Sequence, residues 1–119
     1  MSNKGKRKGT AFESQVARFL SERLGKPGIE RRALQGANDR GDIAGVVVAG
    51  RRVVIECKAE KSLRIPEYLS EAEAERVNDG AWVGVAVCKR RGVGEANAGN
   101  QLVCMTLETF ARILEGLER

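Results

Sequence analysis

The chain has 119 residues, of which 42% are hydrophobic, and its 21 Lys and Arg residues against 16 Asp and Glu residues give a net charge of +5. This size favours a single domain with its own core, and the basic balance favours a polyanionic partner such as DNA. Because the chain contains no His, catalysis by Ser-His-Asp or Cys-His groups and metal sites with His ligands are excluded within it.

Residues 1–9, MSNKGKRKG, are polar and basic. We expect a flexible arm that places Lys6, Arg7 and Lys8 along phosphates, or else a solvated tail, ahead of a single domain over residues 10–119. The arm lacks the apolar segment of a signal peptide, and no apolar run approaches the roughly 20 residues of a membrane span. These features predict a cytoplasmic, intracellular protein without a membrane partner.

The next segments predict a helix and three strands. Apolar residues after Ala11 recur with a period near 3.6, and the stretch GKPG ends this amphipathic helix at about Leu24. A hairpin turn over AGRR joins the last two strands. The strands are expected over residues 29–34, 42–49 and 51–59.

A second helix is expected over residues 70–78, opened by Ser70 with Glu73 as its capping-box partner and closed by the stretch NDG. The apolar run AWVGVAVC, residues 81–88, predicts a strand that is buried on both faces.

The last part of the chain predicts a loop, a strand and a helix. Residues 89–100 are rich in Gly and polar groups, which favours a mobile loop, and a strand follows over residues 101–106. The final helix has on its apolar side Phe110, Ile113, Leu114 and Leu117. The order αβββαββα predicts an α/β fold with a mixed central sheet flanked by helices.

Two charged residues interrupt the strand over residues 51–59. Glu56 and Lys58 share one face with Val54, about 6.6 Å apart along the strand, whereas Cys57 points to the other face. The three cysteines lie far apart in apolar segments, so we expect core thiols rather than a disulfide framework or a zinc site; they are Cys57, Cys88 and Cys104.

Asp42, at the start of the preceding strand, can converge with Glu56 across the hairpin, and Glu13 on the first helix is a further candidate acid. Metal-dependent phosphodiester cleavage uses these residue types. Carboxylate oxygens hold Mg²⁺ or Mn²⁺, the ion polarises the phosphate and acidifies a water, and a Lys such as Lys58 orients or deprotonates that water.

The spacing resembles a known signature. Gly41–Asp42, 13 further residues and Glu56–Lys58 resemble the PD-(D/E)xK motif of a nuclease superfamily, with Gly in place of the frequent Pro. Lys8–Gly9 followed by Glu13 resembles the start of the archaeal and phage-type Holliday junction resolvases of that superfamily. The segment 89–100 has no clear counterpart in the resemblance, and the missing Pro is expected to be harmless.

The resemblance implies a restriction-endonuclease-like αβββαββα core and a homodimer that cuts four-way DNA junctions with paired nicks. It also implies a Mg²⁺ cofactor, with Mn²⁺ as a substitute, held by Asp42, Glu56 and Glu13, while Lys58 serves the attacking water. Such a protein would be nucleoid-associated or phage-encoded. It would serve DNA recombination and repair.

Each candidate has a structural alternative. Glu13 can be the capping-box partner of Thr10, and Asp42 can simply begin a strand after a turn. Glu56 and Lys58 can form an ion pair on a half-exposed sheet. The alternatives for the whole protein are another nuclease of the same superfamily, restriction-like or specific for branched or damaged DNA, and a basic DNA-binding protein of this fold without catalysis.

The remaining charged residues divide into three groups. Those expected to contact phosphates are Arg31, Arg32, Arg40, Lys89, Arg90 and Arg91. An exposed acidic helix face is expected for Glu71, Glu73 and Glu75, and solvent exposure is equally expected for Arg51 and Arg52. Trp82 is expected to pack in the core or in a dimer interface.

Overall fold

The computed structural model describes residues 3–32 and 41–118, and for residues 3–8 it describes the helical backbone only. The elements in chain order are α1 (Asn3–Leu24), β1 (Glu30–Arg31), β2 (Ile43–Ala44), β3 (Val47–Val48), β4 (Arg51–Lys58), α2 (Ile65–Asp79), β5 (Val83–Cys88), the 3₁₀ helix η1 (Glu95–Asn100), β6 (Leu102–Cys104) and α3 (Leu107–Leu117). Within these ranges, no helix is long and apolar enough to cross a membrane.

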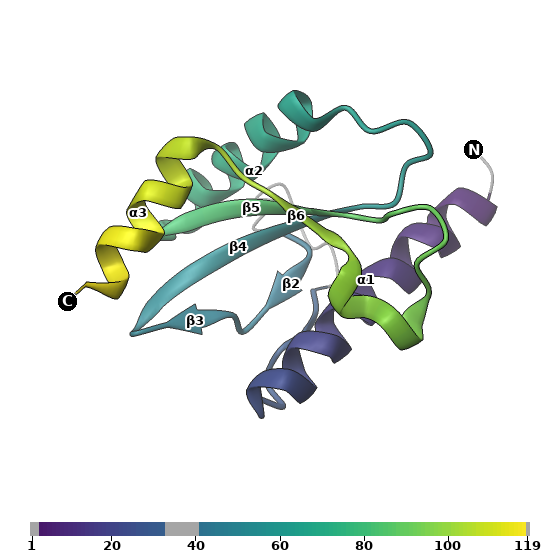
Figure 1. Cartoon of the computed structure of the whole chain (residues 1–119), viewed down its shortest axis with the longest axis horizontal. Coiled ribbons are helices and arrows are strands. Elements are labelled where there is room, and N and C mark those ends of the chain that lie inside the picture. Colours follow the sequence, from purple (N-terminus) through teal and green to yellow (C-terminus); the bar gives the residue numbers. More distant parts are fainter. Residues whose placement is uncertain (1–2, 33–40, 119) are drawn as a thin grey trace.

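Four strands form a mixed sheet in the order β3-β4-β5-β6. β4 and β5 are parallel and are joined by α2, whereas β3 and β6 pair antiparallel at the two edges. Figure 1 shows α2 and α1 on opposite sides of this sheet, while β1 and β2 form a separate short pair. The predicted α/β class with a mixed sheet flanked by helices is thus confirmed.

α1 and α2 pack against the two faces of the sheet through two separate apolar cores. Phe12 and Val16 of α1 lie in one apolar core with Ile55, Val85 and Val87. On the other face, a second core of buried residues joins α2 to β5, namely Tyr68, Ala86 and Cys88. All six residues of β5 are buried, as the continuous apolar run predicted.

Glycine permits the close approach of α2 to β5. A Cβ at Gly84 would lie 2.7 Å from the Ala72 carbonyl oxygen, so any larger residue would push the helix away. Cys88 is fully buried, and burial together with the neighbouring Cys104 thiol raises the pKa of Cys88 to about 12. All three cysteines are free, which confirms the prediction that they are not disulfide-bonded.

Both helix starts differ from the prediction. α1 begins at Asn3, so the residues expected to form a flexible arm belong to its first turns, and Thr10 lies inside the helix instead of capping it. α2 begins at Ile65, with Pro66 in its first turn, where a fixed φ and a missing N–H are tolerated. Ser70 is therefore an interior residue whose hydroxyl donates to the Pro66 carbonyl, and the predicted capping box with Glu73 is wrong.

The predicted strand over residues 42–49 is broken into β2 and β3. Gly45 has a φ of +86°, and a Cβ there would collide with the Gly28 carbonyl, so the backbone turns at this point. The hairpin between β3 and β4 is as predicted, because Ala49 and Gly50 both have the positive φ of a type I′ turn.

Residues 89–100, predicted as a mobile loop, end in the 3₁₀ helix η1, which packs on α1. Glu95 forms an ion pair with Arg18, and a Cβ at Gly99 would lie 3.1 Å from the Phe19 ring. Gln101, which follows η1, donates a hydrogen bond of 3.1 Å to Gln15. The segment lacked an apolar period, so nothing in its pattern indicated this packing.

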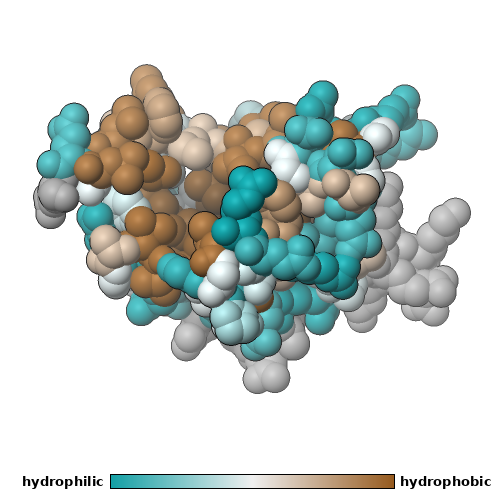
Figure 2. Space-filling model, turned by 60° about the horizontal axis from the view of Figure 1, so that its bottom comes forward, coloured by the Kyte–Doolittle hydropathy of each residue, from teal (hydrophilic) through white to brown (hydrophobic). Residues whose placement is uncertain are grey.

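α3 spans the predicted residues, but its apolar side is exposed. Thr109 is its one buried residue among those that the structure describes, and Thr106 caps its start by accepting from the Thr109 amide at 3.1 Å. At its end, a Cβ on Gly116 would lie 2.6 Å from the half-buried Trp82 ring. Figure 2 shows hydrophobic residues gathered on the surface at this end of the molecule.

Candidate functional site

Asp42 is fastened to β4 by main-chain hydrogen bonds on both sides of Glu56. The Asp42 amide donates to the Ile55 carbonyl at 2.8 Å, and the Cys57 amide donates to Oδ2 of Asp42 at 2.7 Å. These two bonds hold Asp42 against the segment of β4 that contains Glu56. The predicted convergence of the two carboxylates on one ion stays a prediction.

The residue before Asp42 has a conformation that only glycine adopts easily. Gly41 has a φ of +93°, and a Cβ there would lie 3.0 Å from Cγ1 of Val54 and 3.1 Å from the Ile55 carbonyl oxygen. Proline is locked near a φ of −65° and cannot replace it without moving Asp42. Gly41, which stands where the PD-(D/E)xK pattern often has Pro, thus has a backbone conformation that Pro cannot adopt. The prediction that the missing Pro is harmless did not anticipate this conformation.

Glu56 and Lys58 lie on the α2 face of β4. Glu56 is only 7% exposed, and Nζ of Lys58 lies 3.5 Å from its Oε1 and 2.8 Å from Oε2 of Glu71 on α2. The same ammonium group lies 5.1 Å from the centre of the Tyr68 ring. Oε2 of Glu56 is buried and has no hydrogen-bond partner in the described part of the chain.

The surroundings of Lys58 keep it protonated. Burial alone would lower the pKa of its ammonium group, but the hydrogen bond to Glu71 and the charge of Glu56 outweigh burial and raise this pKa above its ordinary range. A protonated Lys orients a water or stabilises negative charge, and it does not accept a proton. The structure therefore favours the orienting role over the deprotonating role that the sequence left open.

Glu13 approaches from the other side of the sheet, because α1 covers the face opposite α2. Its Oε1 accepts a hydrogen bond of 2.9 Å from Nε of Arg31 on β1. Burial, together with the negative charges of Asp42, Glu13 and Glu56, raises the pKa of the Cys57 thiol. The three carboxylates are therefore close enough to Cys57 to act on it together.

The donor set fits a hard divalent cation in its chemistry. Carboxylate oxygens are the ligands that Mg²⁺ and Mn²⁺ prefer, and the orphaned Oε2 of Glu56 is a buried acceptor without a donor. In residues 3–32 and 41–118, no group of three or more His, Cys, Asp or Glu side chains is arranged so that it could hold a metal ion. Mg²⁺ usually keeps several waters and is bound through one or two carboxylates, so the donor set that matches it in kind is the pair Asp42 and Glu56.

The predicted phosphate contacts are only partly described. Lys89, Arg90 and Arg91 line, together with Lys61 and Glu60, a pocket of about 320 Å³ where the chain leaves β4 and β5. Arg90 donates to the Asn100 carbonyl and Lys89 to the Val93 carbonyl, so η1 and its loop support this basic pocket.

Of the arginines near Asp42, Arg31 is paired with Glu13, and the amide of Arg32 donates to the Asp42 carbonyl at 2.7 Å. Arg40 lies outside the described residues, as do the side chains of Lys6, Arg7 and Lys8. Their predicted roles therefore stay predictions.

The sequence analysis neither assigned Glu71 to the site nor expected Glu75 to be buried. Glu71 is the partner of Lys58, and Glu75 is buried at 4% exposure instead of lying on an exposed acidic face. Pro66 could have signalled the earlier start of α2. With that start, Tyr68, Ala72 and Glu75 follow the helical period of a face turned to the sheet.

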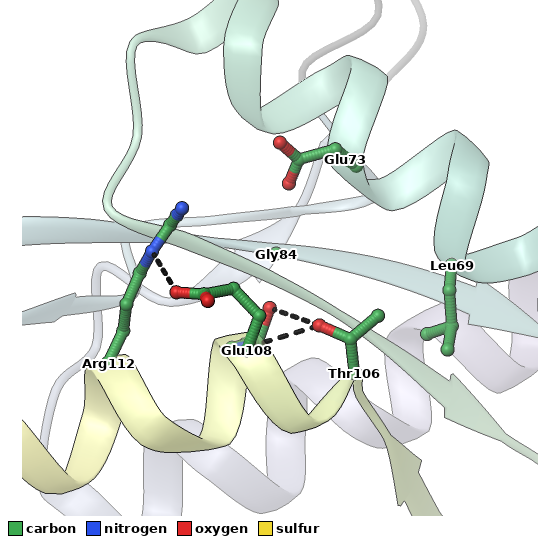
Figure 3. A pocket seen from close by; sticks show the side chains of 7 residues that line it. Leu69, Glu73, Gly84, Thr106, Glu108 and Arg112 are labelled. Atoms are coloured by element: carbon green, nitrogen blue, oxygen red, sulfur yellow. Dashed lines mark hydrogen bonds and ion pairs between the residues drawn. The ribbon is translucent and has the colours of Figure 1, made fainter.

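A smaller pocket of about 140 Å³ lies between α2 and α3. In Figure 3 the carboxylate of Glu73 on α2 faces Glu108 and Arg112 on α3, and Gly84 of β5 forms the floor. Arg112 and Glu108 form an ion pair at 3.4 Å, and Glu73 is bound to Arg76 at 2.6 Å. These charges satisfy one another, and Gly84 lies toward the start of β5 whereas Glu56 and Lys58 lie toward the end of the parallel β4, so this pocket is separate from the carboxylate site.

Comparison with protein-family models, curated proteins and solved structures gives no match for this chain.

Proposed function

We propose that this protein is a metal-dependent endodeoxyribonuclease of the PD-(D/E)xK kind, with a restriction-endonuclease-like core. We further propose that it resolves Holliday junctions as a homodimer, by paired nicks in a four-way junction. The observation that carries the proposal is the buried carboxylate of Glu56, 3.5 Å from the Lys58 ammonium group and beside the hydrogen-bonded Asp42. A buried charge with an unbonded oxygen is expensive for folding, which favours a chemical role.

Asp42 and Glu56 are the residues that would hold Mg²⁺, or Mn²⁺ as its substitute. The third ligand that the resemblance implies, Glu13, approaches from the other side of the sheet and is bonded to Arg31. When bound, such an ion supplies Lewis-acid polarisation of the phosphate and a more acidic water. The chain itself supplies the geometry: the Ile55 carbonyl and the Cys57 amide hold Asp42 in place, and Glu56 is held in the parallel pairing of β4 with β5, opposite Ala86.

Lys58 positions the attacking water. As an ammonium group anchored by Glu71 at 2.8 Å and next to Glu56, it orients the attacking water and stabilises the negative charge that develops on the phosphate. Arg31, whose Nε donates to Glu13, would contact a DNA phosphate beside the scissile one. The basic pocket formed by Lys61 and the residues from Lys89 to Arg91 holds a neighbouring phosphate.

The two strands of a four-way junction that must be cut are related by symmetry. Two copies of one active site related by a two-fold axis meet two such strands, which is the physical use of a homodimer. A nuclease of the same superfamily with a different DNA substrate would keep the chemistry and lose this requirement.

The test is cleavage of an end-labelled four-way junction beside a linear duplex of matched sequence, in Mg²⁺ and in EDTA. Wild type is expected to cut the junction with symmetric nicks in Mg²⁺ only, and Lys58→Ala is expected to lose about 100-fold to 1,000-fold in rate, the usual loss for one preorganised stabilising group. Equal cleavage of junction and duplex would indicate another nuclease of this kind.

A DNA-binding protein without catalysis is the second candidate, favoured by the absence of a complete three-residue metal cage in the described residues. It would bind the junction and leave it uncut in both Mg²⁺ and Mn²⁺. Its affinity would fall with salt by about 0.9 log unit per decade for each neutralised phosphate. Binding with that salt dependence but without nicks would overturn the enzyme proposal.

A further inference from the structure

One edge of the sheet is apolar and uncovered. β6 pairs with β5 on one side only, and its other side has no partner strand in the described residues. Beside it, α3 turns its apolar stripe to the solvent. The exposed residues of this surface, called here the β6–α3 face, are Leu102, Val103, Leu107, Phe110, Leu114 and Leu117, between 40% and 81% exposed.

The stripe on α3 is regular. Leu107, Phe110, Leu114 and Leu117 follow one another at spacings of three and four residues, so they lie on one side of the helix. Such a stripe normally packs against a core, yet α3 instead turns Thr109 inward. The helix therefore has the pattern of a buried element and the position of a surface element.

The area of the face matches what a dimer needs. Six half-exposed large apolar side chains offer on the order of 600 Å², at roughly 100 Å² each, against about 800 Å² per partner in a standard interface. The backbone edge of β6 and the rim residues add to this area. A monomer rarely exposes an apolar patch of this size without a binding role.

β6 carries none of the side chains that keep a free edge strand from pairing. Natural edge strands are protected by short length, Lys, Pro or a bulge, and β6 is short, at three residues, but reads Leu102, Val103, Cys104, without charge or Pro. An uncharged antiparallel edge is complementary to itself under a two-fold axis, so a second copy of the same strand is a natural partner.

The charges around the face argue against nucleic acid as its occupant. Three acids, Glu108, Glu115 and Glu118, border the stripe, in a chain whose net charge is +5. In the described part of the chain the basic residues beside them are Arg112 and Arg51, whose Nη2 lies 3.0 Å from the position of a Cβ on Gly116. These acids repel phosphates, and they reduce the repulsion between two basic copies that meet here.

We infer that two copies of this chain pair through the β6–α3 face, with β6 beside β6 and α3 against α3 across a two-fold axis. The inference rests on the proposed function only in choosing a second copy as the occupant, since two active sites are needed for paired nicks. The inference specifies the surface through which the two copies meet, whereas the proposed function requires a homodimer without specifying that surface. Two four-stranded sheets would then join at their β6 edges.

The experiment is the molar mass in solution by sedimentation, without DNA, for wild type and for the double variant Leu107→Glu with Leu114→Glu. Wild type is expected at twice the chain mass of 12.9 kDa. The double variant is expected at the chain mass, with dimerisation weakened about 100-fold or more, because like charges meet in an apolar contact. Both sites are exposed, at 81% and 48%, so the fold is retained, which circular dichroism checks.

Val77→Glu is the matched control. Val77 is 61% exposed on α2, outside the β6–α3 face, and it receives the same charge. This control is expected to stay at twice the chain mass. A wild type that sediments at the chain mass at about 100 μM, well above a typical micromolar constant, would overturn the inference, and so would a double variant that remains dimeric.

The nicking assay separates this inference from the proposed function. If wild type is a dimer but fails to cut the junction, the inferred dimer surface is supported and the proposed nuclease activity is contradicted. If wild type is a monomer but cuts the junction, the inferred dimer surface is contradicted and the proposed nuclease activity is supported.

Discussion

On the face of β4 that meets α1, Ile55 is buried among Phe12, Val16 and Val85. On the face that meets α2, Glu56 and Lys58 take the equivalent place in the same strand. The two faces thus belong to one strand of eight residues but differ in chemistry toward its end, because Val54 on the face of Glu56 and Lys58 is apolar and buried.

The two faces of β4 contribute differently to the free energy of folding. Each large apolar side chain buried on the α1 face contributes roughly 1.5–3 kcal/mol. A carboxylate such as Glu56, buried with one oxygen unbonded, costs free energy, and an ion pair with Lys58 offsets only part of that. The α1 face of β4 stabilises the domain up to its last residues, whereas the α2 face combines an apolar core with charged groups held in a fixed geometry.

The largest expected effect is on the α1 face. Ile55→Ala is expected to lower the free energy of unfolding by about 2–5 kcal/mol, because Ile55 is 4% exposed and its loss leaves a cavity. Urea denaturation measures this change. Ile55→Val serves as the graded control at about 1 kcal/mol, and a loss under about 1 kcal/mol for Ile55→Ala would contradict the stabilising role of this face.

The connection between β2 and β4 depends on Gly41. Gly41→Ala is expected to cost about 3 kcal/mol, from its positive φ and its contacts with Val54 and the Ile55 carbonyl. Gly50→Ala is the control, because Gly50 has a φ of +77° but open space around it, and it is expected to cost about 1 kcal/mol. Equal losses by thermal melting would show that the contact with β4 is unimportant.

The smallest effect on stability is expected at Glu71, which is half exposed. Glu71→Gln is expected to cost less than about 1 kcal/mol at pH 7, as does Glu67→Gln, the control at another exposed ion pair of α2. Glu71 raises the pKa of Lys58, so its contribution is complete below pH 10.5, the ordinary value, and is lost as the pH rises above it.

The measurement is the difference in free energy of unfolding between wild type and Glu71→Gln from pH 8 to pH 12. A difference that grows above pH 10.5 would contradict the assigned ion pair.

Sequence patterns predicted the parts of the fold that depend on local periodicity. The alternation in β4 separated Glu56 and Lys58 from Ile55 and Cys57 correctly, and the apolar run predicted the buried β5. The hairpin turn followed from Ala49 and Gly50. These features are set by neighbours in the chain, so the sequence is sufficient for them.

Features that depend on distant contacts were missed or misplaced. Gly45 breaks the predicted strand because the Gly28 backbone lies against it, and η1 forms because α1 offers Phe19 and Arg18. Glu71 became a site residue only through the position of α2 over β4. The exposure of the α3 stripe is likewise a tertiary fact, since an amphipathic pattern indicates a contact without naming the partner.

The measurement that tests the central claim most directly is Glu56→Gln, followed by urea denaturation and junction nicking in Mg²⁺ on the same sample. We expect the free energy of unfolding to stay within about 1 kcal/mol of wild type or to rise, because a buried charge is neutralised without a change in shape and Lys58 keeps its closer ion pair with Glu71, at 2.8 Å. We expect nicking to fall about 100-fold or more. A destabilised variant that nicks at the wild-type rate would contradict the claim that this charge serves chemistry and not folding.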